Sequence, residues 1–260
     1  MSPSILARRP SPQLAAGELT HLERVAIDGG LALTQWRGYV DAFRAHGWDV
    51  VEVEPADEHP DGVFVEDAVV VFGDVAVLTS PGAESRRGEV ATVAAALAGL
   101  PLDVRRIERP GTLDGGDVLK VGRTVYVGRT ARTNEAGIAQ LRAIVEPAGW
   151  TVVAVPVTKV LHLKSAVTAL PDGTIVGRAE NVDDVGVFPE FLEVPEEHGT
   201  AVVDLGDGAL LMSSDAPRST ELFRERGYAV TAVPISEFEK LEGCVTCLSV
   251  RVRELTAGPR

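Results

Sequence analysis

Two kinds of side chain in this sequence could supply a nucleophile and a proton carrier. The chain has only two cysteines, Cys244 and Cys247, which form a C-x-x-C pair near the C-terminus. His162 lies within the apolar run KVLHLK. A thiolate is a strong nucleophile, and an imidazole exchanges protons near neutral pH. A histidine in such a run is more typical of a satisfied core residue, so these residue types alone do not establish a catalytic pair.

The C-x-x-C spacing also fits a redox pair or half of a zinc site. However, the segment CVTCLSVRVRE from Cys244 alternates as a β-strand. Residues three apart in a strand point to opposite faces, with Cα atoms about 10 Å apart. That separation exceeds the reach of a disulfide, and no second C-x-x-C is present to complete a zinc site. We therefore expect one cysteine to face a central site and the other to pack in the interior.

Acidic residues at the ends of apolar strands are the next candidates. Asp61, Glu66 and Asp67 precede a valine-rich segment and would attract a cation, although a solvated acidic turn fits the same pattern. Asp114 stands before two glycines. Glycines beside an acid allow a ligand to approach the backbone closely, but in isolation this motif predicts only a turn.

Two arginines occur where a positive charge is locally unfavourable. Arg86 and Arg132 lie at the starts of predicted helices, where a cation opposes the helix dipole by a few tenths of a kcal/mol or more. Such a placement is expected if the arginine binds a carboxylate. Solvated surface arginines are the alternative explanation.

A repeat along the chain indicates how these residues are positioned. Four segments alternate as β-hairpins around a Gly-Asp, Gly-Arg or Asp-Gly pair, the residues that two-residue hairpin turns require; they start at Glu66, Gly116, Ser165 and Thr200. Helical segments follow from Gly88, Asn134 and Arg218. Closely similar strands, each opening with an aromatic residue, start at Trp48, Trp150 and Tyr228.

The repeat predicts the fold class. The N-terminal part supplies a helix from Thr34 and a strand but no hairpin, so we expect the C-terminal strand to pair with N-terminal strands, closing the ring and removing exposed sheet edges. The sequence thus predicts an α/β fold: a fivefold pseudosymmetric α/β propeller of repeated ββαβ units around a central channel, in one catalytic domain of residues 1–260. The third unit, with only VGVFPEFLE from Val185 as its helix, fits least well.

Composition restricts the partners. The 260 residues include 25 basic and 38 acidic side chains, a net charge of −13. This charge disfavours nucleic acid and anionic membranes and favours a small cationic ligand. The sequence shows no signal peptide, spanning segment or disulfide framework, so we expect a cytoplasmic protein. Monomer and homodimer remain open.

Taken in order, these segments resemble the dimethylarginine dimethylaminohydrolase family of the guanidino-group-modifying enzymes, which share the fivefold propeller known as the pentein fold. The resemblance covers nearly the whole chain and rests on DGVFVEDAVV, PGAESRRGE, GTLDGGDV, ARTNEAG, KVLHLK and EGCVTCLSVRV. It implies that Cys247 is the nucleophile, that His162 is the general acid and base, and that Asp114 supports the histidine. Family members carry Asp or Glu at this last position.

The resemblance also implies a set of substrate-binding residues. Asp67 would hold the guanidinium, Arg86 and Arg132 the substrate carboxylate, and Asp61 with the carbonyl of Leu19 the α-amino group. We also expect Glu66 and Leu241 among the substrate-binding residues. The region up to about Gly30 matches the family least well.

The implied reaction is hydrolysis of asymmetric dimethylarginine or monomethylarginine to citrulline and a methylamine through a covalent thiouronium, without metal or cofactor. Inhibitory zinc at Cys247 and His162 stays open. The alternatives are an arginine deiminase, whose chains are longer, and a non-catalytic binding propeller. An amidinotransferase is disfavoured by the same argument of length.

Overall fold

The computed structural model describes residues 2–253. Within them, strands form five three-stranded sheets, each containing one antiparallel and one parallel pair. In hydrogen-bonding order these are β15 (Val250–Val252), β1 (Ser4–Ala7) and β2 (Asp49–Glu52); β3 (Val69–Phe72), β4 (Val75–Leu78) and β5 (Asp103–Arg106); β6 (Val118–Val121), β7 (Thr124–Arg129) and β8 (Thr151–Pro156); β9 (Val167–Ala169), β10 (Ile175–Gly177) and β11 (Phe191–Glu193); β12 (Val202–Gly206), β13 (Ala209–Ser213) and β14 (Ala229–Val233).

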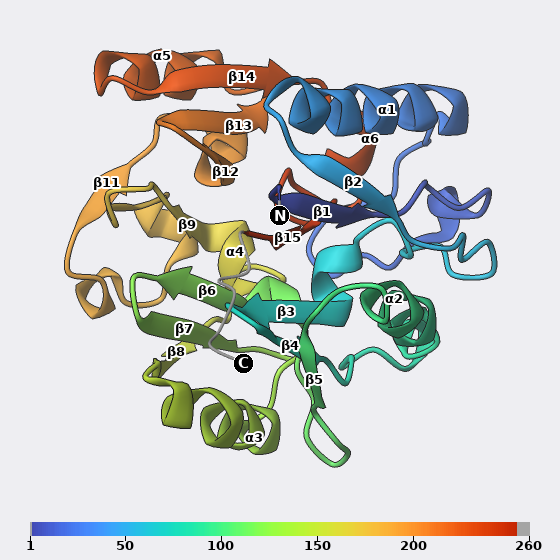
Figure 1. Ribbon diagram of the computed structural model, residues 1–260. Coiled ribbons are helices and arrows are strands. Elements are labelled where there is room, and N and C mark those ends of the chain that lie inside the picture. Colours follow the sequence, from blue (N-terminus) through green and yellow to red (C-terminus); the bar gives the residue numbers. More distant parts are fainter. Residues whose placement is uncertain (1, 254–260) are drawn as a thin grey trace.

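The five sheets lie around a common centre (Figure 1). The first strand of each sheet, β15, β3, β6, β9 or β12, is nearest that centre, and the larger helices lie outside (Figure 1). This arrangement confirms the predicted fivefold α/β propeller. The four predicted hairpins are β3–β4, β6–β7, β9–β10 and β12–β13. Gly73 and Gly122 adopt φ of +64° and +55° in two of these turns, conformations that residues with a Cβ rarely adopt.

Four outer helices connect the second and third strands of four blades: α1 (Gly29–Ala45), α2 (Glu89–Leu97), α3 (Glu135–Val145) and α5 (Pro217–Glu225). Asp28 and Asn134 cap α1 and α3 by accepting the backbone N–H of Leu31 and Gly137. The helix expected from Val185 is absent: the segment forms only a 3-10 turn, Val185–Val187, before β11. VGVFPEFLE lacks the length of the other helices, and Pro189 interrupts it.

The last strand pairs antiparallel with β1, which in turn pairs parallel with β2. The strand predicted from Cys244 is shorter than expected, because only Val250–Val252 are extended. Residues 244–249 instead form turns, held from outside by the Tyr39 hydroxyl, which donates to the carbonyl of Val245 at 2.7 Å. The side chain of Tyr39 is completely buried. The β-propensity of the segment is therefore overridden by a tertiary contact.

A short helical turn precedes each of the four inner strands other than β15. These are the 3-10 turns Val65–Ala68, Gly115–Asp117 and Glu197–Thr200 before β3, β6 and β12, and α4 (Leu163–Ala166) before β9. The turns at residues 244–249 have the corresponding place before β15, just after α6 (Ser236–Glu239). Since the inner strands run from these turns to the hairpins, the turns lie together at one mouth of the channel and the hairpins at the other.

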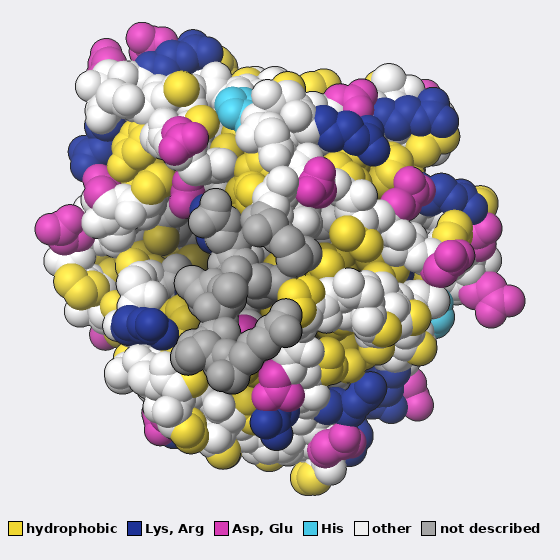
Figure 2. Space-filling model, viewed as in Figure 1, with side chains coloured by type: hydrophobic (Ala, Val, Ile, Leu, Met, Phe, Trp, Pro, Cys, Tyr) yellow, Lys and Arg dark blue, Asp and Glu magenta, His cyan; other side chains and the backbone are white. Residues whose placement is uncertain are grey.

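The surface of one face carries acidic and basic side chains interspersed around its rim (Figure 2). No helix among residues 2–253 combines the length and the apolarity needed to cross a lipid bilayer.

Candidate active site

The turns at one mouth of the channel are hydrogen-bonded to one another around the ring. The carbonyl of Cys247 accepts the N–H of Glu66 at 3.3 Å. The next residue, Asp67, accepts the N–H of Gly116 on its Oδ1 at 2.8 Å. Three neighbouring blades thus fix one another's turns, and the cysteine, the Glu66–Asp67 pair and the Asp-Gly-Gly motif come together.

The two glycines of that motif are required by close packing. A Cβ on Gly115 would lie 1.9 Å from the carbonyl oxygen of Glu66, and one on Gly116 would lie 2.6 Å from Nδ1 of His162. Any larger residue would push the blades apart or displace the imidazole. The Gly-Gly pair therefore allows blade packing and histidine placement, and does not serve only as a turn.

His162 precedes α4 and is buried, with 3% of its surface exposed. Its Nε2 lies 3.1 Å from Oδ2 of Asp114, and its Nδ1 lies 3.9 Å from Oδ1 of Asp67. Burial by itself lowers the pKa of the imidazole, but the carboxylates of Asp67, Asp117 and Asp114 outweigh it and raise the pKa to about 9. The imidazole is therefore protonated at neutral pH.

Two of these carboxylates are held firmly. Asp114 is completely buried, and its Oδ1 accepts the N–H of Gly82 at 2.9 Å. Asp117 accepts hydrogen bonds from the Thr133 hydroxyl and the N–H of Leu163. Burial raises the pKa of Asp117 to about 6 despite these bonds and the nearby imidazole. Asp117, the acid that ends the Asp-Gly-Gly-Asp sequence, therefore belongs to the charge environment of His162 although it was not among the expected site residues.

Arg86 fixes the position of Asp67. Its Nη1 donates to Oδ2 of Asp67 at 2.5 Å, and its Nε and Nη2 donate to Glu89 at 3.1 and 2.8 Å. Burial alone would raise the pKa of Asp67, but His162 and Arg86 lower it to about 2. Every nitrogen of Arg86 already has a protein acceptor, which differs from its expected role of holding a substrate carboxylate. The Arg-x-x-Glu spacing on one helical face was the missed signal for Glu89.

Cys247 lies in the same small cavity as His162 and Asp67, and 8% of its surface is exposed. Its Sγ is 3.3 Å from Sγ of Cys244. The expectation that the two cysteines point to opposite faces is wrong, because residues 244–249 turn instead of extending. The contact between the sulfurs lowers the pKa of Cys244 and raises that of Cys247 well above its usual value, with burial adding to the latter.

The outer part of this cavity contains the remaining polar candidates. Arg132 donates through Nη2 to Glu18 at 2.8 Å. Oδ2 of Asp61 accepts the N–H of Glu18 at 3.0 Å, and Glu18 also accepts from Ser85. Glu18 was not among the expected site residues, since no motif surrounds it in the sequence. With these contacts closed the cavity measures about 20 Å³, room for little more than one water molecule.

Of three further expected binding residues, only one lines this small cavity. Leu241 lines this cavity, whereas Leu19 is absent from its lining and packs against the neighbouring apolar core. Glu66 points into a second cavity at the opposite mouth of the channel. There Lys164 Nζ and Arg251 Nη2 lie 2.6 and 3.3 Å from its Oε1. Glu66 faces away from the small cavity because it lies in a 3-10 turn, in which consecutive side chains point in different directions. Glu66 and Asp67 therefore project to different ends of the channel.

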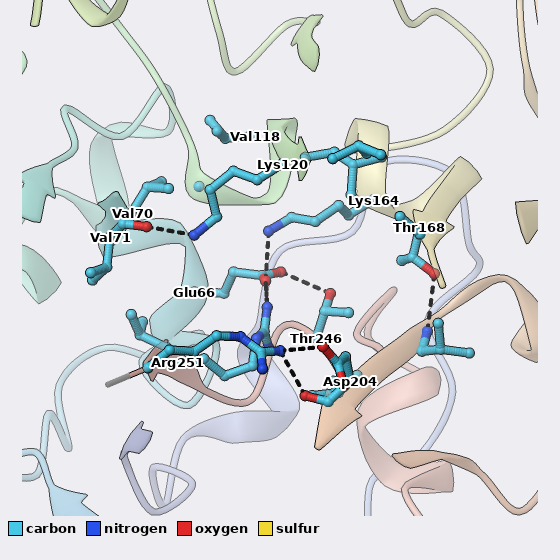
Figure 3. A pocket seen from close by; sticks show the side chains of 18 of the residues that line it. Glu66, Val70, Val71, Val118, Lys120, Lys164, Thr168, Asp204, Thr246 and Arg251 are labelled. Carbon is cyan, nitrogen blue, oxygen red and sulfur yellow. Dashed lines mark hydrogen bonds and ion pairs between the residues drawn. The ribbon is translucent and has the colours of Figure 1, made fainter. Parts of the chain in front are cut away.

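The second cavity is larger, about 550 Å³. Figure 3 shows Lys120 and Lys164 reaching into it, with Glu66 between Lys164 and Arg251. Lys120 donates to the carbonyl of Val71 at 2.5 Å. Desolvation by the surrounding protein, followed by the charges of Arg251, Lys164 and Arg253, lowers the pKa of Lys120 to about 7. The residues among 2–253 that line this cavity supply neither a sulfur nor an imidazole.

One group among residues 2–253 could hold a metal ion: Asp67, Asp114 and His162, whose candidate ligand atoms lie within 4.8 Å of one another. Cys247 is not part of this group. This group therefore differs from the pair Cys247 and His162, for which inhibitory zinc stays an open question. The same three residues are joined by the ion pairs and hydrogen bonds described above, which satisfy them without an ion.

A ring of five ββαβ blades that gathers a thiol, an imidazole and carboxylates at one mouth is the architecture of the guanidino-group-modifying enzymes, the pentein class. The chain is 61% identical to the N(G),N(G)-dimethylarginine dimethylaminohydrolase of Streptomyces coelicolor over 254 residues, 98% of each chain. It is 37% identical to the protein of the same name from Pseudomonas aeruginosa, over 95% of this chain and 98% of that one. The chain belongs to the dimethylarginine dimethylaminohydrolase family, which are hydrolases of C–N bonds.

The structure is also similar to a solved member of this family. A cysteine-to-serine mutant of the Pseudomonas aeruginosa protein in complex with citrulline matches with a TM-score of 0.88 and 35% identity, covering 97% of this chain and 100% of that one. No protein-family model matches the chain.

Proposed function

We propose that this protein hydrolyses asymmetric dimethylarginine and monomethylarginine to citrulline and a methylamine, with Cys247 as nucleophile. The observation that carries the proposal is one cavity lined by Cys247, His162 and Asp67. The relatives' name and the citrulline bound to the Pseudomonas aeruginosa protein support the substrate class.

A cationic substrate explains how a buried thiol becomes reactive. Without ligand, the pKa of Cys247 is raised by its contact with Cys244, by burial and by the carboxylates of Glu66 and Asp67. A guanidinium about 4 Å from the sulfur would favour the thiolate by roughly 4 kcal/mol at an effective dielectric constant of 20. The thiolate therefore forms when substrate binds against Asp67, and attacks the guanidinium carbon.

His162 carries the protons. Because its pKa is raised to about 9, the imidazolium is ready to protonate the methylated nitrogen as it leaves. This leaves a thiouronium on Cys247 and a neutral imidazole. The imidazole then deprotonates the water that attacks the thiouronium, and the sulfur leaves as citrulline forms. Asp114 keeps the ring oriented through its 3.1 Å contact with Nε2.

The amino-acid end of the substrate would bind at the outer part of the cavity. Arg132 is the suitable partner for the carboxylate, and Asp61 and the carbonyl of Leu19 for the α-amino group, with Leu241 beside them. Glu18 now occupies Arg132 and Asp61, so it must withdraw before substrate enters. Arg86 contributes by fixing Asp67, the carboxylate that receives the guanidinium.

The test compares Cys247→Ser with Cys244→Ser in an assay for citrulline. We expect Cys247→Ser to lose about a thousandfold or more in kcat, as removal of a nucleophile does, while still binding substrate. Cys244→Ser should keep its turnover. Wild-type protein is assayed with asymmetric dimethylarginine, monomethylarginine and arginine; faster turnover of arginine would favour a deiminase instead. No turnover of any of them would contradict the proposal and favour a binding protein.

A further inference from the structure

The two cysteines form a contact that the proposed hydrolysis does not use. The N–H of Cys247 donates to the carbonyl of Cys244 at 3.1 Å, which is the hydrogen bond of a four-residue turn. Such a turn keeps its first and last Cα atoms within about 7 Å, close to the upper limit for disulfides. The two Sγ atoms are already 3.3 Å apart. Adjustment of the side chains would therefore bring the sulfurs to bonding distance.

The two sulfurs face different cavities. Cys247 lines the small cavity with His162 and Asp67. Cys244 is half-buried and lines a separate cavity of about 110 Å³, which also includes His198 and Glu239. Cys247 can therefore meet a small oxidant from the substrate side, with Cys244 beside it as its neighbour in the turn.

The surroundings also favour Cys244 as an attacking thiolate. Its Sγ lies 3.3 Å from the Thr246 hydroxyl. The contact with Cys247 and this hydroxyl lower the pKa of Cys244, although burial and Glu66 oppose them. A thiolate next to an oxidised cysteine is the arrangement of a resolving cysteine.

We propose that Cys244 is the resolving cysteine of the nucleophile: it converts an oxidised Cys247 into a Cys244–Cys247 disulfide that reversibly inactivates the enzyme. This inference rests on the proposed function only in naming Cys247 as the nucleophile; the pairing of the sulfurs stands on the geometry alone.

The chemistry balances with a hydroperoxide as oxidant. The proton shared across the 3.3 Å contact can move to Cys244, and the Cys247 thiolate that this leaves attacks one oxygen of hydrogen peroxide; the O–O bond breaks, hydroxide leaves, and the sulfur becomes a sulfenic acid after losing two electrons. The Cys244 thiolate then attacks that sulfur, so that an S–S bond forms and the S–O bond breaks, releasing a second hydroxide. Each hydroxide takes up a proton, giving two waters. An added dithiol reverses the change by thiol–disulfide exchange.

Without Cys244 the sulfenic acid has no thiol partner, because the chain contains no other cysteine. Further peroxide would then drive it to the sulfinic acid, which dithiols do not reduce. The C-x-x-C pair therefore protects the nucleophile as well as switching it off.

The experiment treats reduced wild-type protein and Cys244→Ser with hydrogen peroxide and follows intact mass, free thiols and citrulline production before and after dithiothreitol. Wild type should lose two hydrogens and both free thiols, and recover its activity and mass with dithiothreitol. Cys244→Ser should gain two oxygens, and its recovered fraction should be at least about tenfold smaller. Cys247→Ser, the matched control, should show neither the disulfide nor rapid oxidation of Cys244.

Two results would overturn the inference: sulfinic acid on wild-type Cys247 with no loss of two hydrogens, or equal recovery of wild type and Cys244→Ser. Mass and thiol counts do not depend on turnover. A protein that forms the disulfide but makes no citrulline would contradict the proposed hydrolysis alone.

Discussion

The two mouths of the channel are built from neighbouring residues of the same turns, yet their charges are arranged differently. Asp67 and His162 face the small cavity, and Glu66 and Lys164 face the large one. In the small cavity, several carboxylates surround one imidazole and raise its pKa. In the large cavity, desolvation and then several surrounding cations lower the pKa of one amine, that of Lys120. A shift of one or two residues within a turn therefore separates proton-transfer chemistry from a structural ion pair.

The largest expected difference between the two mouths is in kcat, when substitutions of His162 and Lys164 are compared. His162→Gln should lower kcat by about a thousandfold, since it removes the proton carrier. Lys164→Met should leave kcat within a few-fold but lower the free energy of unfolding by about 3 kcal/mol, because it leaves the buried Glu66 with fewer partners. Citrulline assays and urea titrations measure both. A stable Lys164→Met protein without activity would break the separation of the two mouths.

The next largest expected difference is in kcat/KM, when substitutions of Asp67 and Glu66 are compared. Asp67→Asn removes the charge that holds the guanidinium and supports the imidazolium, so kcat/KM should fall about a hundredfold, equivalent to roughly 3 kcal/mol. Glu66→Gln should keep kcat/KM within about fivefold, since its carboxylate bonds to Lys164, Thr246 and Arg251 at the other mouth. If the two variants lost equal activity, Glu66 would also act on substrate.

The pH dependence of stability should have opposite signs at the two mouths. The pKa of His162 is raised from 6.5 to about 9 on folding, so its contribution is complete below pH 6.5 and disappears as pH rises to 9, up to about 3 kcal/mol. The pKa of Lys120 is lowered from 10.5 to about 7, so its contribution increases from pH 7 to 10.5. The Lys120 effect should be smaller because the cavity exposes its side chain to solvent.

Urea titrations between pH 6 and 10 check these signs. His162→Gln should flatten the fall in stability relative to wild type, and Lys120→Met should flatten the rise. A His162→Gln protein with the wild-type pH dependence would contradict the high pKa of the imidazole.

The smallest effect concerns entry to the small cavity. Glu18→Ala removes the side chain that competes with the substrate carboxylate for Arg132. A partly exposed ion pair of this kind contributes up to about 1 kcal/mol, so KM should fall by up to about fivefold with kcat unchanged. Glu84→Ala, which removes an exposed glutamate paired with Arg87, is the matched control. A rise in KM would show that Glu18 helps to bind substrate.

The sequence predicted the blades well because their signals are local. The turn glycines, the capping residues Asp28 and Asn134, and the alternating strands each specify their own segment. The repeat then predicted the ring, and the order of the motifs predicted which residues approach the channel. Leu241, His162 and Cys247 indeed line one cavity.

The errors arose where distant parts of the chain decide the local conformation. Residues 244–249 turn because the Tyr39 hydroxyl holds Val245 and the Thr246 hydroxyl donates to Glu66 at 2.9 Å. No pattern within the segment indicates those contacts. The side to which Glu66 points depends on the same packing. Glu18 lies in a loop whose position is set by Asp61 and Arg132, so its sequence carried no signal.

The central claim is that the sulfur of Cys247 attacks the guanidinium carbon. Mass spectrometry of wild-type protein, acid-quenched during turnover of asymmetric dimethylarginine, tests it most directly. We predict a thiouronium adduct on the peptide that contains both cysteines, located at Cys247, present in Cys244→Ser and absent from Cys247→Ser. Citrulline production during the same turnover with no adduct on that peptide, or an adduct on Cys244 instead, would contradict the account.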